Sequence, residues 1–324
     1  MKKVLIIQTA FIGDVILATG MVETICAGVS DVQVSMVVRK GNEGLFTNHP
    51  LVHEVFVWDK KKGKYKSLFS LIQQIRKKHF DVVINAQRFA SSGLLTVLSG
   101  AAQTIGFKKN PWSFLFSKKI DHIIDVHAGM HETDRNHELV KAIFPTEKRK
   151  PKLYVPEIPW TETNYVTISP ASVWETKKLP VEKWIELILL HKNEKFFLMG
   201  GPADVDLCKE IASRANIGED KVLAGKFSLL QSAAIMKGAR MNYVNDSGPL
   251  HLCTATDAPV TAVFCSTIPE FGFGPLSTRQ VVIEANPRPA CKPCGLHGKK
   301  ACPLGHFNCG YKITIEQLSA ALPS

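Results

Sequence analysis

The sequence predicts an α/β protein made of two doubly wound, Rossmann-like domains, and three observations lead to this. Continuous apolar, β-branched segments alternate with amphipathic ones, which is typical of a parallel sheet covered by helices on both faces. The chain has 324 residues, too many for one ordinary core and suited to two domains of about 150 residues each. A proline-rich stretch also interrupts the alternation near the middle.

The first half of the chain begins with a strand and a helix, and this order repeats. Apolar runs predict strands, and the longer amphipathic segments between them predict helices. The expected strands are 2–8, 32–38 and 80–86, and the expected helices are 14–28 and 68–78.

Residues 145–160, "PTEKRKPKLYVPEIPW", carry four prolines and little periodicity, so they predict an interdomain linker. We therefore expect domains at 1–155 and 156–324, facing each other across a cleft, with a final helix that either stays with the second domain or packs back on the first. The alternation then restarts, with strands at 165–170, 195–201, 241–245 and 259–264 and helices at 181–192, 203–215, 229–239 and 248–256.

The net charge of +11 is concentrated in the first half. Residues 1–150 contain 22 Lys and Arg against 13 Asp and Glu, whereas residues 151–324 contain 18 against 16. Such asymmetry indicates an anionic partner, such as nucleic acid, an acidic glycan or a phospholipid surface, or else simply a solvated basic face.

The apolar segments are strand-sized and far shorter than the ~20 residues of a membrane-spanning helix. The N-terminus, "MKKVLIIQTAFIGD", superficially resembles a signal peptide, but Asp14 interrupts it and no small-residue cleavage site follows. We read it as a first strand and expect a cytoplasmic protein that can lie on a membrane surface.

The eight cysteines form two groups. Four lie in apolar contexts and predict small buried side chains: Cys26, Cys208, Cys253 and Cys265. The other four, Cys291, Cys294, Cys302 and Cys309, follow the pattern C-x2-C-x7-C-x6-C. This pattern allows a zinc site, although its second half is unusually wide. Disulfides and free thiols remain alternatives, and a reducing compartment favours the thiols.

Three segments follow strands and lead into helices, where ligands bind in open α/β sheets. The first, "QTAFIGDV", contains Asp14, which either caps a helix or acts in catalysis. The second, "SPASVWETKKLP", carries Lys177 after small residues, well placed for a diphosphate. The third is "VNDSGPLHL" at 244–252.

The third segment has the composition of a helix N-terminus. Asp246 and Ser247 suit capping, Gly248 permits close backbone approach, and Pro249 suits a first helical turn. Exposed N–H groups and the helix dipole make such a turn an anion site, to which His251 adds a donor. The alternative is an ordinary capped helix with a satisfied histidine.

Five segments form a recognisable series along the chain: "FIGDVILATGMVETI", "SPASVWETKKLPVEKWIELI", "MGGPAD", "LAGKFSLLQSAAIMKGA" and "NDSGPLHLCTATDAPVTAVF". In their order and spacing they resemble glycosyltransferase family 9, especially the ADP-heptose:lipopolysaccharide heptosyltransferases. The resemblance covers essentially the whole chain. The late "CKPCGLHGKKACPLGHFNCG" is similar to tails of the heptosyltransferase II-like branch.

The resemblance implies the two-domain fold called GT-B, with the acceptor on the N-terminal domain and the nucleotide-sugar on the C-terminal one. It implies Asp14 as the general base. It implies a donor site that comprises Ser172, Lys177, Lys226 beside the adenine, Asp246, Ser247, Gly248 and His251. Leu179 departs from the family pattern, in which many members have Trp, and Asp204 is only a weak candidate for a ribose-binding acid.

Elementary chemistry agrees with this implication. Inverting transfer needs one base on the acceptor hydroxyl, and Lys177, His251 and backbone N–H groups can stabilise the leaving diphosphate. No paired acids with an evident metal role occur, so we expect no metal and no cofactor. The basic first half suits an acidic lipopolysaccharide precursor at the inner-membrane surface rather than nucleic acid. Its candidate acceptor contacts are Arg88, His131 and Arg135, each of which could instead be a surface cation.

Three alternatives remain at this point. A family-9 relative that uses another nucleotide-sugar or acceptor fits the same motifs. A non-catalytic nucleotide-binding protein with a GT-B shell is disfavoured by the intact Asp14 and Lys177. A dinucleotide oxidoreductase is disfavoured because "MGGPAD" lacks the third glycine and does not follow the first strand.

Overall fold

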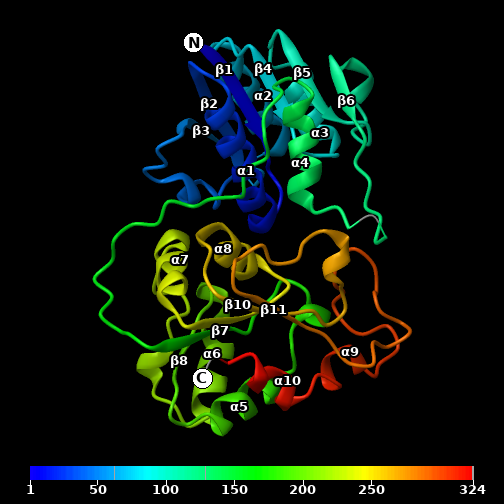
Figure 1. Cartoon of the computed structure of the whole chain (residues 1–324). Coiled ribbons are helices and arrows are strands. Elements are labelled where there is room, and N and C mark those ends of the chain that lie inside the picture. Colours follow the sequence, from blue (N-terminus) through cyan, green and yellow to red (C-terminus); the bar gives the residue numbers. More distant parts are fainter. Residues whose placement is uncertain (62, 128, 323–324) are drawn as a thin grey trace. The chain divides into compact units, whose positions relative to one another are not determined.

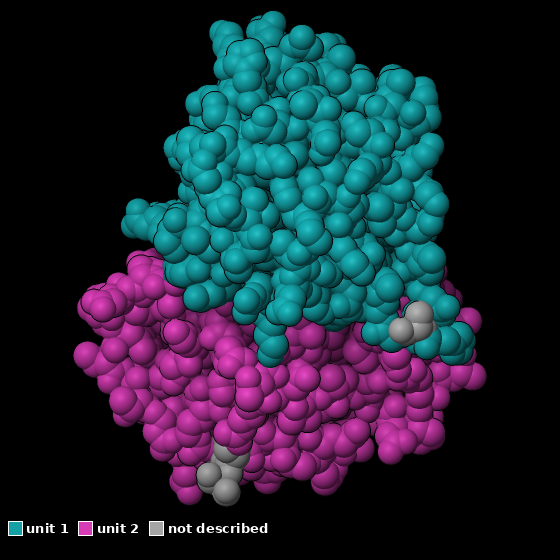
Figure 2. Space-filling view, turned by 45° about the horizontal axis from the view of Figure 1, so that its top comes forward, with its two compact units in different colours: residues 1–154 teal, residues 155–324 magenta. Residues whose placement is uncertain are grey.

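The computed structural model describes residues 1–61, 63–127 and 129–322. The chain divides into two compact units, unit 1 (Met1–Tyr154) and unit 2 (Val155–Ser324), which are coloured separately in Figure 2. Each unit contains one sheet whose paired strands run parallel (Figure 1). Two parallel-sheet α/β domains are therefore present, as the alternating pattern predicted.

The sheet of unit 1 has the strand order β3-β2-β1-β4-β5-β6. Its core forms because the buried stretches of the central strands are largely apolar, as expected for strands covered on both faces. The strands are β1 (Lys2–Ile7), β2 (Val32–Arg39), β3 (Val52–Trp58), β4 (Val82–Asn85), β5 (Gln103–Phe107) and β6 (Lys118–Ile120). The helices are α1 (Ile12–Gly28), α2 (Lys64–Arg76), α3 (Ala90–Val97) and α4 (Glu132–Lys141).

Alternation along β1 divides the core of unit 1 between two faces. Leu5 and Ile7 belong to a cluster with apolar residues of α2 and α3. The intervening Val4 and Ile6 are equally buried and point to the opposite face. There α1 and α4 pack against each other (Figure 1).

The sheet of unit 2 has the order β11-β10-β9-β7-β8. Its strands are β7 (Tyr165–Ser169), β8 (Lys195–Leu198), β9 (Met241–Asn245), β10 (Val260–Val263) and β11 (Gln280–Ile283). Its helices are α5 (Val181–Leu190), α6 (Val205–Arg214), α7 (Leu229–Gly238), α8 (Gly248–Thr256), α9 (Asn308–Tyr311) and α10 (Ile315–Ala320).

The last helix, α10, is part of the core of unit 2. It packs on α5, and Leu318 is fully buried in the cluster that contains Trp184 and Tyr243. The Tyr243 hydroxyl also donates to the Leu318 carbonyl (2.8 Å). The helix thus stays with the second domain, which was one of the two arrangements that the sequence left open.

The segment that leaves unit 1 lies along α1, and we call residues 146–154 the strap. The Arg149 amide donates to Thr24 Oγ1 (3.0 Å) and the Lys152 amide to Thr19 Oγ1 (3.0 Å). The approach is close, because a Cβ added at Gly20 would lie 3.2 Å from the Arg149 carbonyl oxygen. The first half of the expected linker is therefore part of unit 1.

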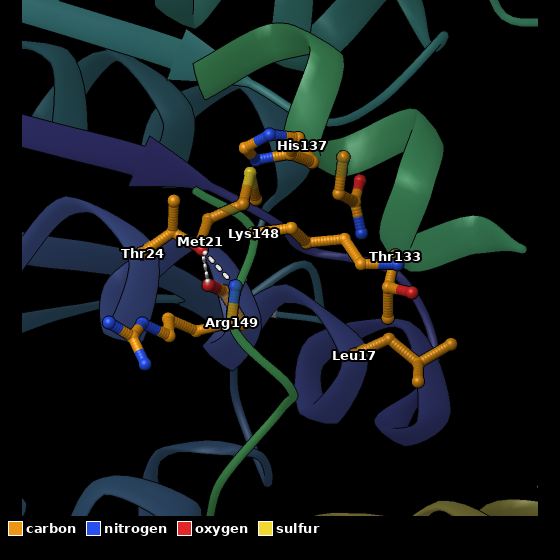
Figure 3. A pocket seen from close by; sticks show the side chains of 9 residues that line it. Leu17, Met21, Thr24, Thr133, His137, Lys148 and Arg149 are labelled. Atoms are coloured by element: carbon orange, nitrogen blue, oxygen red, sulfur yellow. Dashed lines mark hydrogen bonds between the residues drawn. The ribbon is translucent and has the colours of Figure 1, made fainter. Parts of the chain in front are cut away.

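Figure 3 shows the seam between α1, α4 and the strap, with Arg149 bonded to Thr24. The depression along this seam has no room for a water molecule. We therefore regard it as a packing seam and not as a ligand site. It is lined by Leu17, Gly20, Met21, Thr24, Thr133, Asn136, His137, Lys148 and Arg149.

Among the described residues, no helix is both long and apolar enough to cross a membrane.

The strand order of each sheet indicates where ligands should bind. In unit 1 the chain builds β2 and β3 on one side of β1 and then crosses to β4 on its other side. In unit 2 it builds β8 on one side of β7 and then crosses to β9. Crevices at the carboxyl ends of such strand pairs are the usual ligand sites of open α/β sheets.

Candidate functional site

The switch point of unit 2 brings together most of the predicted donor residues. Ser172 and Lys177 lie in the loop that follows β7, and Asp246, Ser247 and Gly248 follow β9 directly. We call residues 170–179 the Lys177 loop. Since β7 and β9 pair in the sheet, their carboxyl ends carry these two segments side by side.

An ion pair joins the two segments. Lys177 Nζ lies 2.6 Å from Asp246 Oδ2, and the two side chains are only 14% and 7% exposed. The Thr267 hydroxyl donates to the same carboxylate oxygen (2.6 Å). Asp246 therefore holds the Lys177 ammonium group and does not cap α8, contrary to the sequence prediction. Thr267 was not identified from the sequence, because nothing local marks a threonine after a buried strand.

The N-terminus of α8 has no side-chain cap. Ser247 occupies the N-cap position, but its side chain makes no cap hydrogen bond. Its hydroxyl donates instead to the carbonyls of Ala171 and Asn245, both at 3.4 Å. The first-turn N–H groups of a helix favour an anion when no side chain satisfies them. This end of α8 is thus suited to phosphate oxygens beside Lys177.

Asn245 fixes the Lys177 loop at both of its ends. Its Nδ2 donates to the Pro170 carbonyl (2.8 Å), and its Oδ1 accepts from the Leu179 amide (2.9 Å). The asparagine is fully buried at the end of β9, so these bonds form in a low-dielectric setting. The loop between them is held at a defined length, with Lys177 close to its C-terminal end.

The remaining candidates for the donor site, His251, Lys226 and Asp204, differ in their exposure and contacts. His251 is buried in the first part of α8, with its ring 6.4 Å from that of Phe273. Lys226 is exposed, just before α7. Asp204 Oδ2 accepts from the Gly201 amide (2.8 Å) at the start of α6, so this carboxylate helps to fix that turn.

The switch point of unit 1 carries Asp14 and Arg88. Asp14 follows β1 and is the third residue of α1, whose N-cap residue is Phe11. Asp14 is therefore not the N-cap residue, which was one of the two roles that the sequence left open. Arg88 follows β4, the strand beside β1, and is half-buried.

Polar side chains connect the loops at this edge of unit 1. The Thr9 hydroxyl donates to Gln87 Oε1 (2.7 Å), and Gln8 Nε2 donates to the Ala86 carbonyl (3.3 Å). Asn110 Nδ2, from the loop after β5, donates to the Gln87 carbonyl (3.1 Å). These bonds hold the segments that carry Asp14 and Arg88 in fixed positions.

His131 and Arg135 have structural contacts at the start of α4. His131 is the N-cap residue, and its Nδ1 accepts from the Thr133 amide (3.1 Å). Arg135 is 1% exposed, with Nε donating to Glu132 (2.7 Å) and NH1 donating to the Met130 carbonyl (2.7 Å). Burial alone would raise the pKa of Glu132, but His122 and Arg135 lower it overall. Both side chains thus have structural partners at the start of α4.

The prediction of buried cysteines holds for three of the four residues in the first group. Cys208, Cys253 and Cys265 are fully buried, and Cys26 is half-buried. All four thiols of the second group are free, and the described residues contain no set of three His, Cys, Asp or Glu side chains arranged to hold a metal ion. Burial alone would raise the pKa of the Cys302 thiol, but backbone N–H donors from residues 304–307 together lower it overall.

Known proteins are similar to this chain over most of its length. The family model described as glycosyltransferase family 9 (heptosyltransferase) matches residues 68–303. The chain is 24% identical to lipopolysaccharide heptosyltransferase 1 of Campylobacter coli, over 82% of this chain and 84% of that protein.

Solved structures share the whole fold. A glycosyltransferase of family 9 from Veillonella parvula DSM 2008 has a TM-score of 0.85 at 21% identity, covering 99% of this chain and 96% of that one. The E. coli ADP-heptose lps heptosyltransferase II has a TM-score of 0.77 at 20% identity, covering 99% and 98%. The GT-B fold is thus confirmed. Because the family model spans more than two thirds of its length, this chain belongs to glycosyltransferase family 9, the heptosyltransferase family, and is a glycosyltransferase.

Proposed function

We propose that this glycosyltransferase moves heptose from ADP-L-glycero-D-manno-heptose, with inversion, onto the Kdo/heptose inner core of a lipopolysaccharide precursor. The observation that carries the proposal is the Lys177–Asp246 pair beside the uncapped N-terminus of α8. A cation held in a largely buried setting next to a helix N-terminus suits a diphosphate leaving group. The relatives named above as lipopolysaccharide heptosyltransferases support the sugar and the acceptor.

In this proposal unit 2 binds ADP-heptose. Lys177 and the first-turn N–H groups of α8 stabilise the negative charge that develops as the C–O bond to the diphosphate breaks. Ser172, Ser247 and Gly248 shape the phosphate site, His251 supports it from within α8, and Lys226 borders the adenine. These groups supply the positive charge from the protein itself, so we propose that transfer needs neither a metal nor a cofactor.

Unit 1 binds the acceptor, and Asp14 acts as the general base. Its carboxylate accepts the proton of the acceptor hydroxyl as oxygen attacks the anomeric carbon from the face opposite the departing diphosphate. Arg88, in the loop after the neighbouring strand, is the candidate contact for an acidic acceptor. The net charge of residues 1–150 also favours an anionic ligand.

We also propose that the enzyme works at the cytoplasmic face of the inner membrane. An apolar loop of unit 1, residues 110–116, supports this. Phe114 and Leu115 are 68% and 50% exposed, and the Trp112 and Phe114 rings stack at 6.4 Å. Exposed lysines flank the loop at 108, 109, 118 and 119. Aromatic and apolar side chains between cations suit the interface of an anionic bilayer.

The test is incubation of the protein with ADP-heptose and lipopolysaccharides truncated at successive core positions. The expected result is release of ADP together with an acceptor mass increase of one heptose. UDP- and GDP-sugars serve as competing donors, and metal analysis of the active protein checks the metal-free mechanism. Transfer from a different nucleotide-sugar, with none from ADP-heptose, would point instead to a family-9 relative of other specificity.

A further inference from the structure

The chain returns to the Lys177 loop more than 100 residues later, through residues 291–300, which we call the tail segment. The Thr176 amide donates to the Lys299 carbonyl (3.1 Å), and Thr176 Oγ1 accepts from the Lys299 amide (2.8 Å). The Ser266 hydroxyl donates to the same Oγ1 (2.9 Å). Thr176 and Ser266 are buried, so these bonds tie the residue before Lys177 to two distant segments.

Gly298 is the point of closest approach. It is buried within an otherwise exposed stretch of the tail segment. A Cβ added there would lie 2.4 Å from Trp174 Cβ and 2.9 Å from Lys177 Cγ. Real Cβ atoms do not approach other atoms so closely, so only glycine lets the backbone lie directly on the Lys177 stem.

The tail segment is itself anchored in unit 2. Lys292 is buried, and its Nζ donates to the Phe264 carbonyl (2.5 Å) and pairs with Glu284 Oε1 (2.5 Å). The Cys294 amide donates to the Ser266 carbonyl (2.9 Å). Since a buried charge is costly unless it is paired, this anchor resists displacement. The backbone at Gly298 is therefore fixed from both sides.

We propose that the tail segment is a brace for Lys177 and that Gly298 is a positioning residue for donor binding. A lysine stem has several rotatable bonds, and fixing them only when ADP binds would cost conformational entropy. The brace restricts the stem beforehand, while Asp246 holds the ammonium group at its other end. This inference rests on the proposed binding of the ADP diphosphate by Lys177.

The test compares ADP binding of Gly298→Ala and the wild-type protein by calorimetry. The added methyl group must push Trp174 and Lys177 away, so we expect Kd to rise about tenfold, as for partial loss of a charge-assisted hydrogen bond. Gly44→Ala is the matched control, because a Cβ there meets nothing within 4 Å and Kd should stay unchanged. Melting temperatures establish that both variants are folded.

A double-variant cycle separates positioning from general destabilisation. Lys177→Met removes the charge but keeps the stem, and it should weaken ADP binding by itself. In that background Gly298→Ala should have little further effect on Kd, because its effect passes through Lys177. A folded Gly298→Ala protein with wild-type affinity, or losses that simply add, would overturn the brace.

Two further outcomes are distinguishable. If Lys177→Met binds ADP as the wild-type protein does, the proposed donor role of Lys177 fails, and the brace fails with it. If Gly298→Ala does not fold, Thr176→Val takes its place in the cycle. That change removes the hydroxyl that accepts from Lys299 and Ser266. The expected rise in Kd and its disappearance in the Lys177→Met background are the same.

Discussion

The position of Asp14 in α1 distinguishes between two roles for its carboxylate, helix N-cap and general base. It is the third residue of α1, so its side chain cannot be the N-cap, which is Phe11. A carboxylate in a first helical turn still interacts favourably with the helix dipole, typically by 0.3–1 kcal/mol. Its contribution to stability should therefore be small, whereas a general base is indispensable to turnover.

Asp14→Asn should lower turnover by at least ~100-fold, because an amide cannot accept the acceptor proton. ADP affinity should stay unchanged, and the free energy of unfolding should fall by less than about 1 kcal/mol. Steady-state kinetics, calorimetry and thermal melting measure the three effects. Glu182→Gln is the control, since Glu182 is also a first-turn carboxylate, in α5, but has no proposed role in transfer. Near-normal turnover of the Asn variant would remove Asp14 from the mechanism.

At the scale of elements, the sequence predicted those strands and helices that have a clear apolar periodicity. The strands β1, β2, β4, β7, β8, β9 and β10 and the helices α1, α2, α5, α6, α7 and α8 were predicted, with ends that differ by a few residues. The strands β5 and β11 and the helices α3 and α4 were not predicted. β6 was not predicted, because its three residues, "KKI", lack an apolar pattern. β3 was also missed, since only two of its seven residues are fully buried.

Among the residues of the candidate sites, too, those marked by a local sequence pattern were predicted and the others were not. Loops after strands are recognisable in sequence, so Asp14, Lys177 and the turn after β9 were identified. Thr267 and Gly298 were not, because their contacts join residues 21 and more than 100 positions apart. The sequence shows where a glycine lies, but it does not show which distant residues pack against that glycine.

His49 makes the stability of unit 1 depend on pH. Its ring lies edge-on to that of Tyr154 in the strap, with centroids 4.7 Å apart. Burial and, to a lesser extent, Lys152 lower its pKa from 6.5 to about 4. Between these values the unfolded chain binds a proton that the folded chain does not, so stability falls as pH falls from 6.5 towards 4.

We expect this histidine alone to cost about 2 kcal/mol of unfolding free energy at pH 5 relative to pH 7. Urea denaturation at both pH values measures the difference. His49→Gln should reduce the loss, whereas His53→Gln, at an exposed position, should leave it unchanged. Equal losses in all three proteins would show that carboxylates, not His49, cause the acid sensitivity.

At the scale of the whole molecule, charge and apolar exposure together predict membrane binding. Sedimentation with anionic vesicles should bring down the protein at low salt and less of it at 0.5 M salt, where surface charges are screened. Phe114→Ser combined with Leu115→Ser should weaken binding further. Turnover on a soluble truncated acceptor should not change.

The matched control is Leu190→Ser, which removes an equally exposed apolar side chain from α5. It should sediment as the wild-type protein does. If the loop variant binds vesicles as well as this control does, residues 110–116 are not the contact. If none of the proteins binds at low salt, the basic charge of the first half only aids solubility.

Because the strap is held on α1, only a short segment of chain connects unit 1 to unit 2. Residues up to Tyr154 are fastened to α1, where the Tyr154 hydroxyl donates to Glu23 (3.1 Å). From Trp160 onward the chain is fastened to unit 2, because the Trp160 ring packs against those of Tyr165 and Phe197. Only residues 155–159, "VPEIP", are left between these anchors. Five residues reach at most about 17 Å, and two prolines stiffen them. Glycines inserted there would therefore lengthen this connection while leaving the cores of both units unchanged.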